Sequence, residues 1–343
     1  MTLVPVERSA SFGFAHEATI GTRVPPTFGL ENIDKGTVNP GQTWADDRKA
    51  HGLPYPRQVD KKPDHLMPTI DTTLSMNIPN IGMLLALCTQ SVVQSGAGPF
   101  TQIVIFPTLG VHVTLDSVGS ANGRTGTVVT RYGQTGSLNE ALLGAVATEV
   151  SMNFGEGRVK PKVKWMALDY RDDDAGTGVF TLPATDVLGR DAIFKLGDGT
   201  PVPLYSDEVT ITIRAVVTPH WYGGIVSGGR PYRLVFSDWT GEVTFTKPLI
   251  TGTNSFMKDH YVDGGDVAND LLMYVYDRTM TDYNAVLANG NWRFTLNISP
   301  DNVERQLADE TKDSVTASFK YDGSNQPFKY EQCTTATQAS WAS

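Results

Sequence analysis

Histidine, glutamate and cysteine, which could bind a metal or catalyse a reaction, are present in this chain, but their spacing matches no known motif. His16-Glu17 would open a zinc-hydrolase helix only if a second histidine stood four positions on, and Ile20 stands there instead. Cys88 and Cys333 lie far apart and form no CxxC pair. The remaining histidines are scattered, at positions 51, 65, 112, 220 and 260. The sequence therefore predicts neither a zinc site nor a disulfide framework.

Two carboxylate clusters are the better candidates for holding a cation. Asp172-Asp-Asp174 and Asp263-Gly-Gly-Asp266 offer oxygen ligands of the kind that hard cations prefer, but neither matches the twelve-residue calcium loop. Gly197-Asp-Gly199 lacks the third glycine and the following helix of a dinucleotide cradle. The chain has no GxSxG elbow and no phosphate loop. We expect no catalytic centre, no metal and no cofactor; an unfamiliar carboxylate pair stays open as the enzyme alternative.

Composition and charge exclude a generic basic nucleic-acid binder. The chain of 343 residues holds 28 Lys and Arg against 37 Asp and Glu, a net charge of -9. The charge is unevenly placed: residues 1–171 carry 15 basic and 14 acidic residues, whereas residues 172–343 carry 13 and 23. This asymmetry indicates two surfaces with different electrical roles, or simply more solvated acidic loops in the second half.

No targeting or membrane-spanning segment is predicted. The first thirty residues lack a basic start followed by an apolar run. The most apolar short stretch, Ile81 to Cys88, falls far below the roughly 18 residues that cross a bilayer. We expect a soluble protein made in a reducing cytoplasm.

The dominant hydrophobic period is two, which predicts strands with one face in a core. Gly-rich turn signals separate many such runs and favour an antiparallel sandwich or barrel. The clearest alternating segments are 111–115, 150–154, 209–217, 294–298 and 315–321. Helical signals are restricted to Pro79–Gln90 and Thr279–Asn289, each followed by a stop signal or strand.

The order of strand, short helix, strand and later strand occurs twice along the chain, which predicts two tandem β-domains, 1–171 and 172–343. The first carries the segment 29–68, which is irregular and rich in proline. A structureless loop of that length is unusual unless it is functional. We interpret 29–68 as an extended arm that reaches a neighbouring subunit; a surface loop is the alternative.

The N-terminal segment Ser11 to Thr27 resembles the opening of tail tube proteins of long-tailed bacteriophages. Those proteins often begin with an aromatic-glycine pair, then Glu-x-Thr-x-Gly-Thr and Pro-Thr. The matching positions here are Gly13, Glu17, Thr19, Gly21, Thr22, Pro26 and Thr27. Asp282 to Gly290 is similar to a Tyr-Asn step of the larger tail tube proteins, and Pro79 to Leu87 to their short Leu-rich helix. The long 29–68 arm departs from the usual pattern.

The resemblance implies an all-β, antiparallel sandwich or barrel of the tail-tube type, here as two tandem copies with one or two short helices. It implies a structural virion protein that forms trimeric pseudo-sixfold or hexameric rings, stacked helically into a conduit for genome ejection. DNA would pass through the lumen without specific binding, past a wall whose negative charge comes largely from 172–343. Tape measure, tail terminator and distal tail proteins are the implied partners, and the virion tail, assembled in the host cytoplasm, is the implied location.

The interface residues expected on this basis lie in the opening motif and in the arm. They are Phe12, Gly13, Glu17, Gly21, Thr22, Pro54, Tyr55 and Pro56. Two alternatives stay open. One is a capsid-decoration or baseplate protein; the other is a carbohydrate-binding β-sandwich with aromatic platforms drawn from Trp165, Trp221, Trp239 and Trp292.

Overall fold

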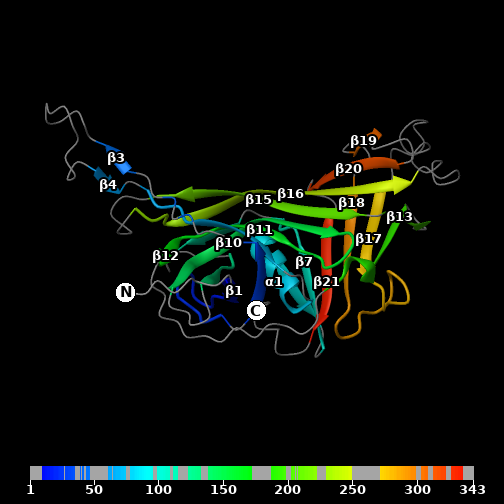
Figure 1. Cartoon of the computed structure of the whole chain (residues 1–343), viewed down its shortest axis with the longest axis horizontal. Coiled ribbons are helices and arrows are strands. Elements are labelled where there is room, and N and C mark those ends of the chain that lie inside the picture. The colour runs from blue at the N-terminus through cyan, green and yellow to red at the C-terminus, as the bar shows by residue number, and fades with distance from the viewer. Residues whose placement is uncertain are drawn as a thin grey trace, which may run out of the picture.

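A computed structural model of the chain describes most of the sequence. The described residues are 10–26, 28–34, 39, 41, 44–46, 61–63, 65–74, 78–95, 99–108, 111–114, 123–132, 138–171, 187–197, 202–204, 206, 208–221, 229–248, 271–298, 303–307, 312–321 and 326–334. Their regular structure is almost entirely antiparallel β-sheet, so the prediction of an all-β fold is confirmed. Figure 1 shows the strands in layers, with helix α1 (Ile78–Thr89) packed among them.

Within the described residues the larger sheet has twelve strands. They are β1 (Ala10–His16), β2 (Phe28–Asp34), β5 (Thr69–Leu74), β8 (Val111–Thr114), β9 (Gly126–Tyr132), β10 (Leu138–Phe154), β11 (Lys162–Met166), β12 (Asp169–Arg171), β15 (Val209–His220), β16 (Arg233–Pro248), β19 (Val303–Leu307) and β20 (Lys312–Lys320). The order is β11-β5-β2-β1-β9-β10-β15-β16-β20-β19, with β12 paired to β10 and β8 to β16. Each of the five alternating segments predicted from the sequence contains a strand, here or in the smaller sheet, although β8 is described only to Thr114 and β20 ends at Lys320.

One end of this sheet closes on itself. Because β11 pairs with β10 as well as with β5, the strands β11-β5-β2-β1-β9-β10 form a closed ring, which we call the barrel. The long strand β10 makes this possible. Its first part pairs with β9 and β12, and its second part pairs with β11 and β15. β10 therefore belongs both to the barrel and to the open remainder of the sheet.

The smaller sheet has seven strands in the order β14-β13-β17-β18-β21-β7-β6. Their bounds are β6 (Val92–Ser95), β7 (Phe100–Ile105), β13 (Ala192–Gly197), β14 (Val202–Pro203), β17 (Leu271–Asp277), β18 (Trp292–Ile298) and β21 (Phe328–Thr334), with the 3-10 turn η3 (Gly189–Asp191) before β13. Aromatic rings join the two sheets: Phe154 on β10 stacks on Trp292 on β18 at 5.7 Å between centroids, and Phe106, next to β7, stacks on Phe319 on β20 at 6.1 Å. We call this sheet together with β15, β16, β19 and β20 the sandwich.

Each of the two sheets contains strands from residues 1–171 and strands from residues 172–343. The barrel is built from residues before that point, but β6, β7 and β8 come from the first half and pair within the sandwich, β7 with β21 and β8 with β16. The division into domains 1–171 and 172–343 stays a prediction. Any such domains are joined through these strand pairs and through β10.

Helix α1 agrees with the predicted helix at Pro79–Gln90. Residues 81–90 are all buried, which explains why the segment is apolar on every side. Gln90 ends the helix with a φ of 64°, and its side chain donates to the Leu87 carbonyl at 2.6 Å. The same side chain accepts from the Arg124 N–H at 2.5 Å, which ties the helix end to the segment before β9.

The second predicted helix, Thr279–Asn289, is wrong: this segment is a series of turns between β17 and β18. The reason is a side chain from outside the segment. The guanidinium of Arg293 on β18 donates to the carbonyls of Tyr283 at 2.8 Å and Ala285 at 3.2 Å, which a helix would use for its own i to i+4 bonds. Asp282 adds to this by accepting from the Tyr283 N–H and from Lys195 on β13, both at 2.7 Å.

The predicted arm 29–68 is only partly irregular. Its start belongs to β2, which pairs with β1 in the barrel, so the prediction of irregular structure is wrong for Gly29–Asp34. Two short strands, β3 (Trp44–Asp46) and β4 (Lys61–Pro63), pair with each other alone. Figure 1 shows this hairpin projecting from the body of the molecule, as an extended arm would.

Candidate functional site

A buried carboxylate with four hydrogen-bond donors, that of Glu17, lies where β1 ends. The Glu17 side chain is only 3% exposed. Its Oε2 accepts from the Thr125 hydroxyl at 2.7 Å and the Gly21 N–H at 2.8 Å; its Oε1 accepts from the Thr127 hydroxyl at 2.8 Å and the Gly144 N–H at 3.0 Å. A buried carboxylate is tolerated when several donors satisfy it. Glu17 thus connects the turn after β1 to β9 and β10.

Two glycines shape this site. Gly21 has a φ of 72°, and the turn around it is closed by a bond from the Thr22 N–H to the Thr19 carbonyl at 3.0 Å. Gly144 has a φ of 61° at the point where the β9–β10 register shifts. A Cβ on Gly144 would lie 2.7 Å from the Leu168 side chain. The bulge therefore needs glycine, and it turns the Gly144 N–H toward Glu17.

The structure gathers most of the predicted motif residues in the barrel wall. Phe12 is fully buried and packs on Trp165 at 6.0 Å between ring centroids. Gly13 lies in the middle of β1, paired with β2 and β9. Thr22 is exposed. The other predicted interface residues, Pro54, Tyr55 and Pro56, lie outside the described residues. The interface role stays a prediction, and the Phe12 and Glu17 side chains already have partners within their own chain.

Sequence reasoning found Glu17 and Gly21 but missed the other three donors. Thr125, Thr127 and Gly144 stand more than one hundred positions away, and each looks like an ordinary strand residue. The only local signal was the pair of threonines at alternate positions, which places both hydroxyls on one side of a strand. Strand pairing of β1 with β9, and of β9 with β10, brings them to the carboxylate.

The outward face of the larger sheet is polar over several adjacent strands. Glu149 on β10 forms ion pairs with Lys164 on β11 and Arg214 on β15, both at 3.2 Å, and Arg214 also reaches Glu242 on β16 at 3.4 Å. These pairs are partly exposed and stabilise the fold by at most about 1 kcal/mol each. They produce a charged row across four strands, with no reactive group among them.

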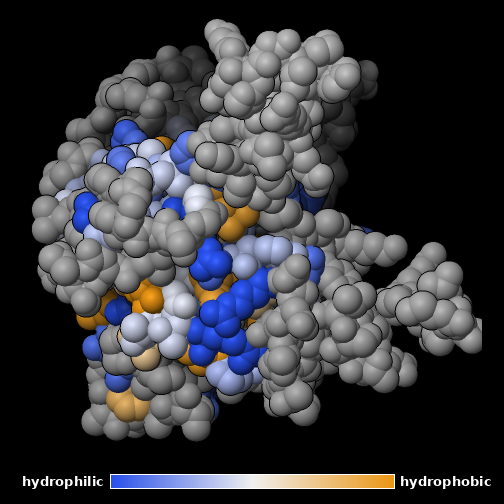
Figure 2. Space-filling model, turned by 90° about the vertical axis from the view of Figure 1, so that its left-hand side faces the viewer, coloured by the Kyte–Doolittle hydropathy of each residue, from blue (hydrophilic) through white to orange (hydrophobic). Residues whose placement is uncertain are grey.

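Hydroxyl groups continue this polar face. Ser151 on β10 and Thr212 on β15 share a hydrogen bond at 2.8 Å, and Thr244 and Thr316 on β16 and β20 share one at 3.2 Å. Figure 2 shows the end of the molecule at the left of Figure 1, where hydrophilic side chains form a band and hydrophobic ones occur in small patches. Among the described residues the large hydrophobic side chains that stay exposed are Val93, Val216 and Val286. The surface is suited to polar rather than apolar contacts.

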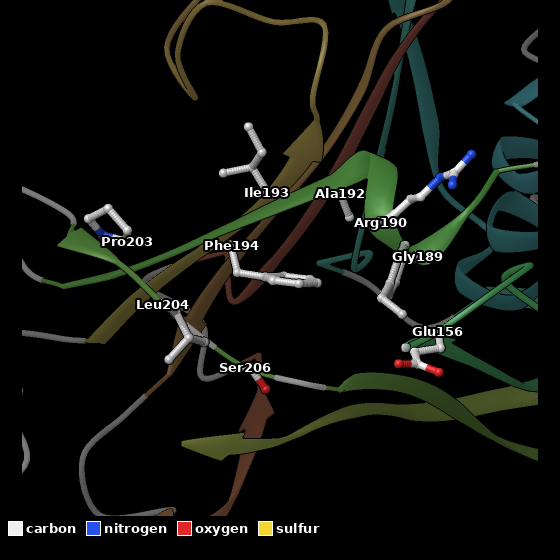
Figure 3. A pocket seen from close by; sticks show the side chains of 11 residues that line it. Glu156, Gly189, Arg190, Ala192, Ile193, Phe194, Pro203, Leu204 and Ser206 are labelled. Atoms are coloured by element: carbon white, nitrogen blue, oxygen red, sulfur yellow. The ribbon is translucent and has the colours of Figure 1, made fainter. Parts of the chain in front are cut away.

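A hollow of about 410 Å³ lies where the end of β10 meets η3, β13 and β14. Figure 3 shows the Phe194 ring in the middle of it, with Leu204 and Ser206 to one side and Arg190 and Glu156 to the other. Among the described residues that line the hollow there is no histidine, cysteine or lysine, and Glu156 is the one carboxylate. Figure 3 places Glu156 and Ser206 on different sides of the Phe194 ring, so these two residues do not form a nucleophile–base pair.

The candidate metal and thiol chemistry is not assembled in the described part of the chain. No group of three His, Cys, Asp or Glu side chains lies close enough there to hold a metal ion. The clusters 172–174 and 263–266 fall outside the described residues. Cys88 and Cys333 are both free thiols and buried. Burial, with the nearby Glu149 charge, raises the pKa of Cys88 far above its ordinary value, so it is a poor nucleophile.

Three of the four tryptophans considered as sugar platforms are core residues. Trp165, Trp239 and Trp292 are 1%, 6% and 1% exposed. The Trp165 Nε1 donates to the Thr72 hydroxyl at 3.0 Å. Trp221 is partly exposed, but the edge of His65 packs on it at 4.6 Å between ring centroids. A row of accessible aromatic faces is therefore not formed by these residues.

Comparison with known proteins adds no assignment. The sequence matches no model of a known protein family, and no curated protein matches it. Among the described residues, no helix is long and apolar enough to cross a membrane.

Proposed function

We propose that this chain is a structural virion protein that polymerises as stacked rings into the tail tube of a long-tailed bacteriophage. The observation that carries the proposal is the role of the opening motif. Gly13, Glu17 and Gly21, which the resemblance to tail tube proteins singles out, take part in building the barrel around a buried carboxylate. We expect the characteristic motif of a structural protein to stabilise its fold and not to form a reaction centre.

Other features favour a building block over the alternative functions. In the hollow of Figure 3 the carboxylate of Glu156 and the hydroxyl of Ser206 lie on different sides, and the described residues hold no metal cluster. The carbohydrate-binding alternative is weakened because three of its four platform tryptophans lie in the core. The projecting β3–β4 hairpin offers a means of contacting a neighbour.

Electron microscopy of the purified chain tests the proposal. We expect rings, or tubes of stacked rings, whose mass gives three or six copies per ring. Monodisperse monomers under all assembly conditions would contradict it. Decoration of capsids without rings would favour the capsid-decoration alternative, and binding to glycans by monomers would favour the carbohydrate-binding one.

The proposal includes the nature of the channel. DNA passes through the lumen without specific binding, because fixed cations would hold phosphates in a salt-dependent manner. Carboxylates drawn largely from residues 172–343 give the wall its negative charge. A structure of the assembled ring tests this directly, and a wall lined mainly by Lys and Arg would refute it.

A further inference from the structure

A row of cations stands at every second position just before and along β11. Arg158, Lys160, Lys162 and Lys164 alternate with Val159, Pro161, Val163 and Trp165. All four cations are exposed, and all four intervening residues are buried. Because side chains of an extended chain alternate between faces, the four charges share the outward face of the larger sheet. We call these four residues the cationic row.

The row borders a groove of about 740 Å³ on that face. Arg158, Lys160 and Lys162 line it, and Glu156 is the one carboxylate among the described residues of its lining. The rest of the lining is glycine or neutral hydrogen-bonding residues: Thr73, Ser151, Asn153, Gly157 and Thr210. Among the described residues Lys160 and Lys162 form no ion pair, whereas Lys164 is paired with Glu149. Lys160 and Lys162 therefore bring to the groove positive charge that no described carboxylate pairs with, beside hydroxyl and amide groups. This combination suits carboxylates.

The chain itself supplies complementary charge. Residues 172–343 carry a net charge of -10, whereas residues 1–171, which hold the row, carry +1. We propose that the cationic row is a self-association surface that binds the acidic half of a second copy of this chain. The contact joins two different surfaces, so it repeats from copy to copy and builds a ring or a stack instead of stopping at a dimer. This inference rests on the proposed function and gives its assembly an electrostatic basis.

A nucleic acid is the less suitable occupant. The whole chain has a net charge of -9, which repels a polyanion at long range. In a conduit, a row of exposed lysines that bound phosphate would also retard the DNA. If carboxylates of the next copy contact the cationic row, they neutralise its charge, and the row no longer retards the DNA.

The deciding experiment measures self-association of K160E/K162E by sedimentation velocity and electron microscopy at about 0.1 M salt. The matched control is R171E/R278E, which makes the same charge change at two exposed arginines that do not line the groove. We expect at least a tenfold loss of assembly for K160E/K162E and little loss for the control. High salt should weaken wild-type assembly and remove the difference. K160Q/K162Q, which removes charge without reversing it, serves if the double glutamate variant does not fold, and it should lose assembly less.

The outcomes separate this inference from the proposed function. Rings or tubes that form equally well from K160E/K162E would overturn the role of the row and leave the tail-tube proposal intact. Wild-type oligomers that are not rings but that need Lys160 and Lys162 would support the row and contradict the tail tube. A wild type that stays monomeric overturns both. Binding of a labelled single-stranded oligonucleotide by the wild type, lost in K160E/K162E, would assign the row to nucleic acid instead.

Discussion

The barrel and the sandwich each bury a glutamate, and they satisfy it in opposite ways. In the barrel, Glu17 accepts from neutral hydroxyl and N–H donors. In the sandwich, Glu331 is 5% exposed and pairs with Arg293 and Lys329, both of which come from the same sheet. The hydrogen bonds to Glu17 form only if the backbone holds the hydroxyl and N–H donors in the right positions. The ion pairs of Glu331 can form over a wider range of backbone positions, because the Arg and Lys side chains are long and flexible.

This difference matches the architecture of the two regions. The barrel is a closed ring of strands with no edge of its own, and its buried carboxylate connects three segments of that ring. In the described chain, the sheets of the sandwich end at β6, β14 and β19 and are held face to face by aromatic rings. The barrel is specified by directional bonds, and the sandwich by packing. Shared strand β10 couples the two.

The largest effect is expected from removing the core tryptophan of either region. Trp165→Ala in the barrel and Trp292→Ala in the sandwich should each lower the free energy of unfolding by about 3–5 kcal/mol. Because β10 belongs to both regions, urea unfolding followed by circular dichroism should show one transition that either variant shifts. Two separate transitions, with each variant shifting only one of them, would mean that barrel and sandwich unfold independently.

The next effect concerns the Glu17 hydrogen bonds. Glu17→Ala leaves two buried hydroxyls and two N–H groups without their acceptor, and each such loss costs about 1–3 kcal/mol before relaxation. We expect a total loss of about 3 kcal/mol in the free energy of urea unfolding. Glu17→Gln should also destabilise, because its amide nitrogen cannot accept. The control Glu156→Ala, at an exposed carboxylate, should stay within about 0.5 kcal/mol of the wild type. Equal stability of E17A and E156A would remove Glu17 from its central role.

The strands and the Glu17 site show what could be predicted from the sequence and what could not. Alternation predicted the strands, because a face buried in a core must be apolar at every second residue. Glu17 was identified through a resemblance, but nothing near it in the chain predicted that it is buried. The β10–β11 pair follows a local turn signal, Gly155-Glu-Gly157. Closure of the barrel also needs the β5–β11 pair, which joins segments about ninety positions apart and leaves no local trace.

The failed helix at 279–289 illustrates the same limit. The residues Tyr283, Val286 and Leu287 have helical spacing, and Asn289-Gly290 is a good helix end. What overrides this pattern is Arg293, whose position on β18 is fixed by pairing with β17 and β21. Tertiary contacts of this kind decide short segments whose own helical preference is weak.

Two glycines provide a matched pair of smaller effects. Gly144→Ala in the barrel forces a residue with a side chain to keep a φ of 61° and brings its Cβ within 2.7 Å of Leu168. Gly241→Ala in the sandwich places a Cβ in overlap with the Phe319 ring, which is itself buried. Each should lower the free energy of unfolding by about 1–3 kcal/mol, measured by urea titration. Gly157→Ala, where a Cβ meets nothing within 4 Å, controls for positive φ alone. A G144A variant no less stable than G157A would show that the bulge accommodates a side chain.

The smallest effect sharpens the contrast between the two buried glutamates and is a dependence on pH. Burial raises the pKa of the Glu331 carboxyl, but hydrogen bonds and charge from Arg293 and Lys329 outweigh it and hold the pKa below its ordinary value of 4.5. A carboxyl with a lowered folded-state pKa stabilises the protein fully above its unfolded pKa, and the stabilisation is lost as the pH falls through the folded pKa.

Glu331→Gln should therefore cost about 1–2 kcal/mol at pH 7, measured by urea unfolding. The difference from the wild type should shrink as the pH falls below 4.5. The exposed Glu208→Gln serves as the control and should show little difference at either pH. If the loss of stability in E331Q stays constant down to pH 3, the charge of Glu331 does not stabilise the sandwich. Hydrogen-bond geometry would then be the important factor, as it is at Glu17.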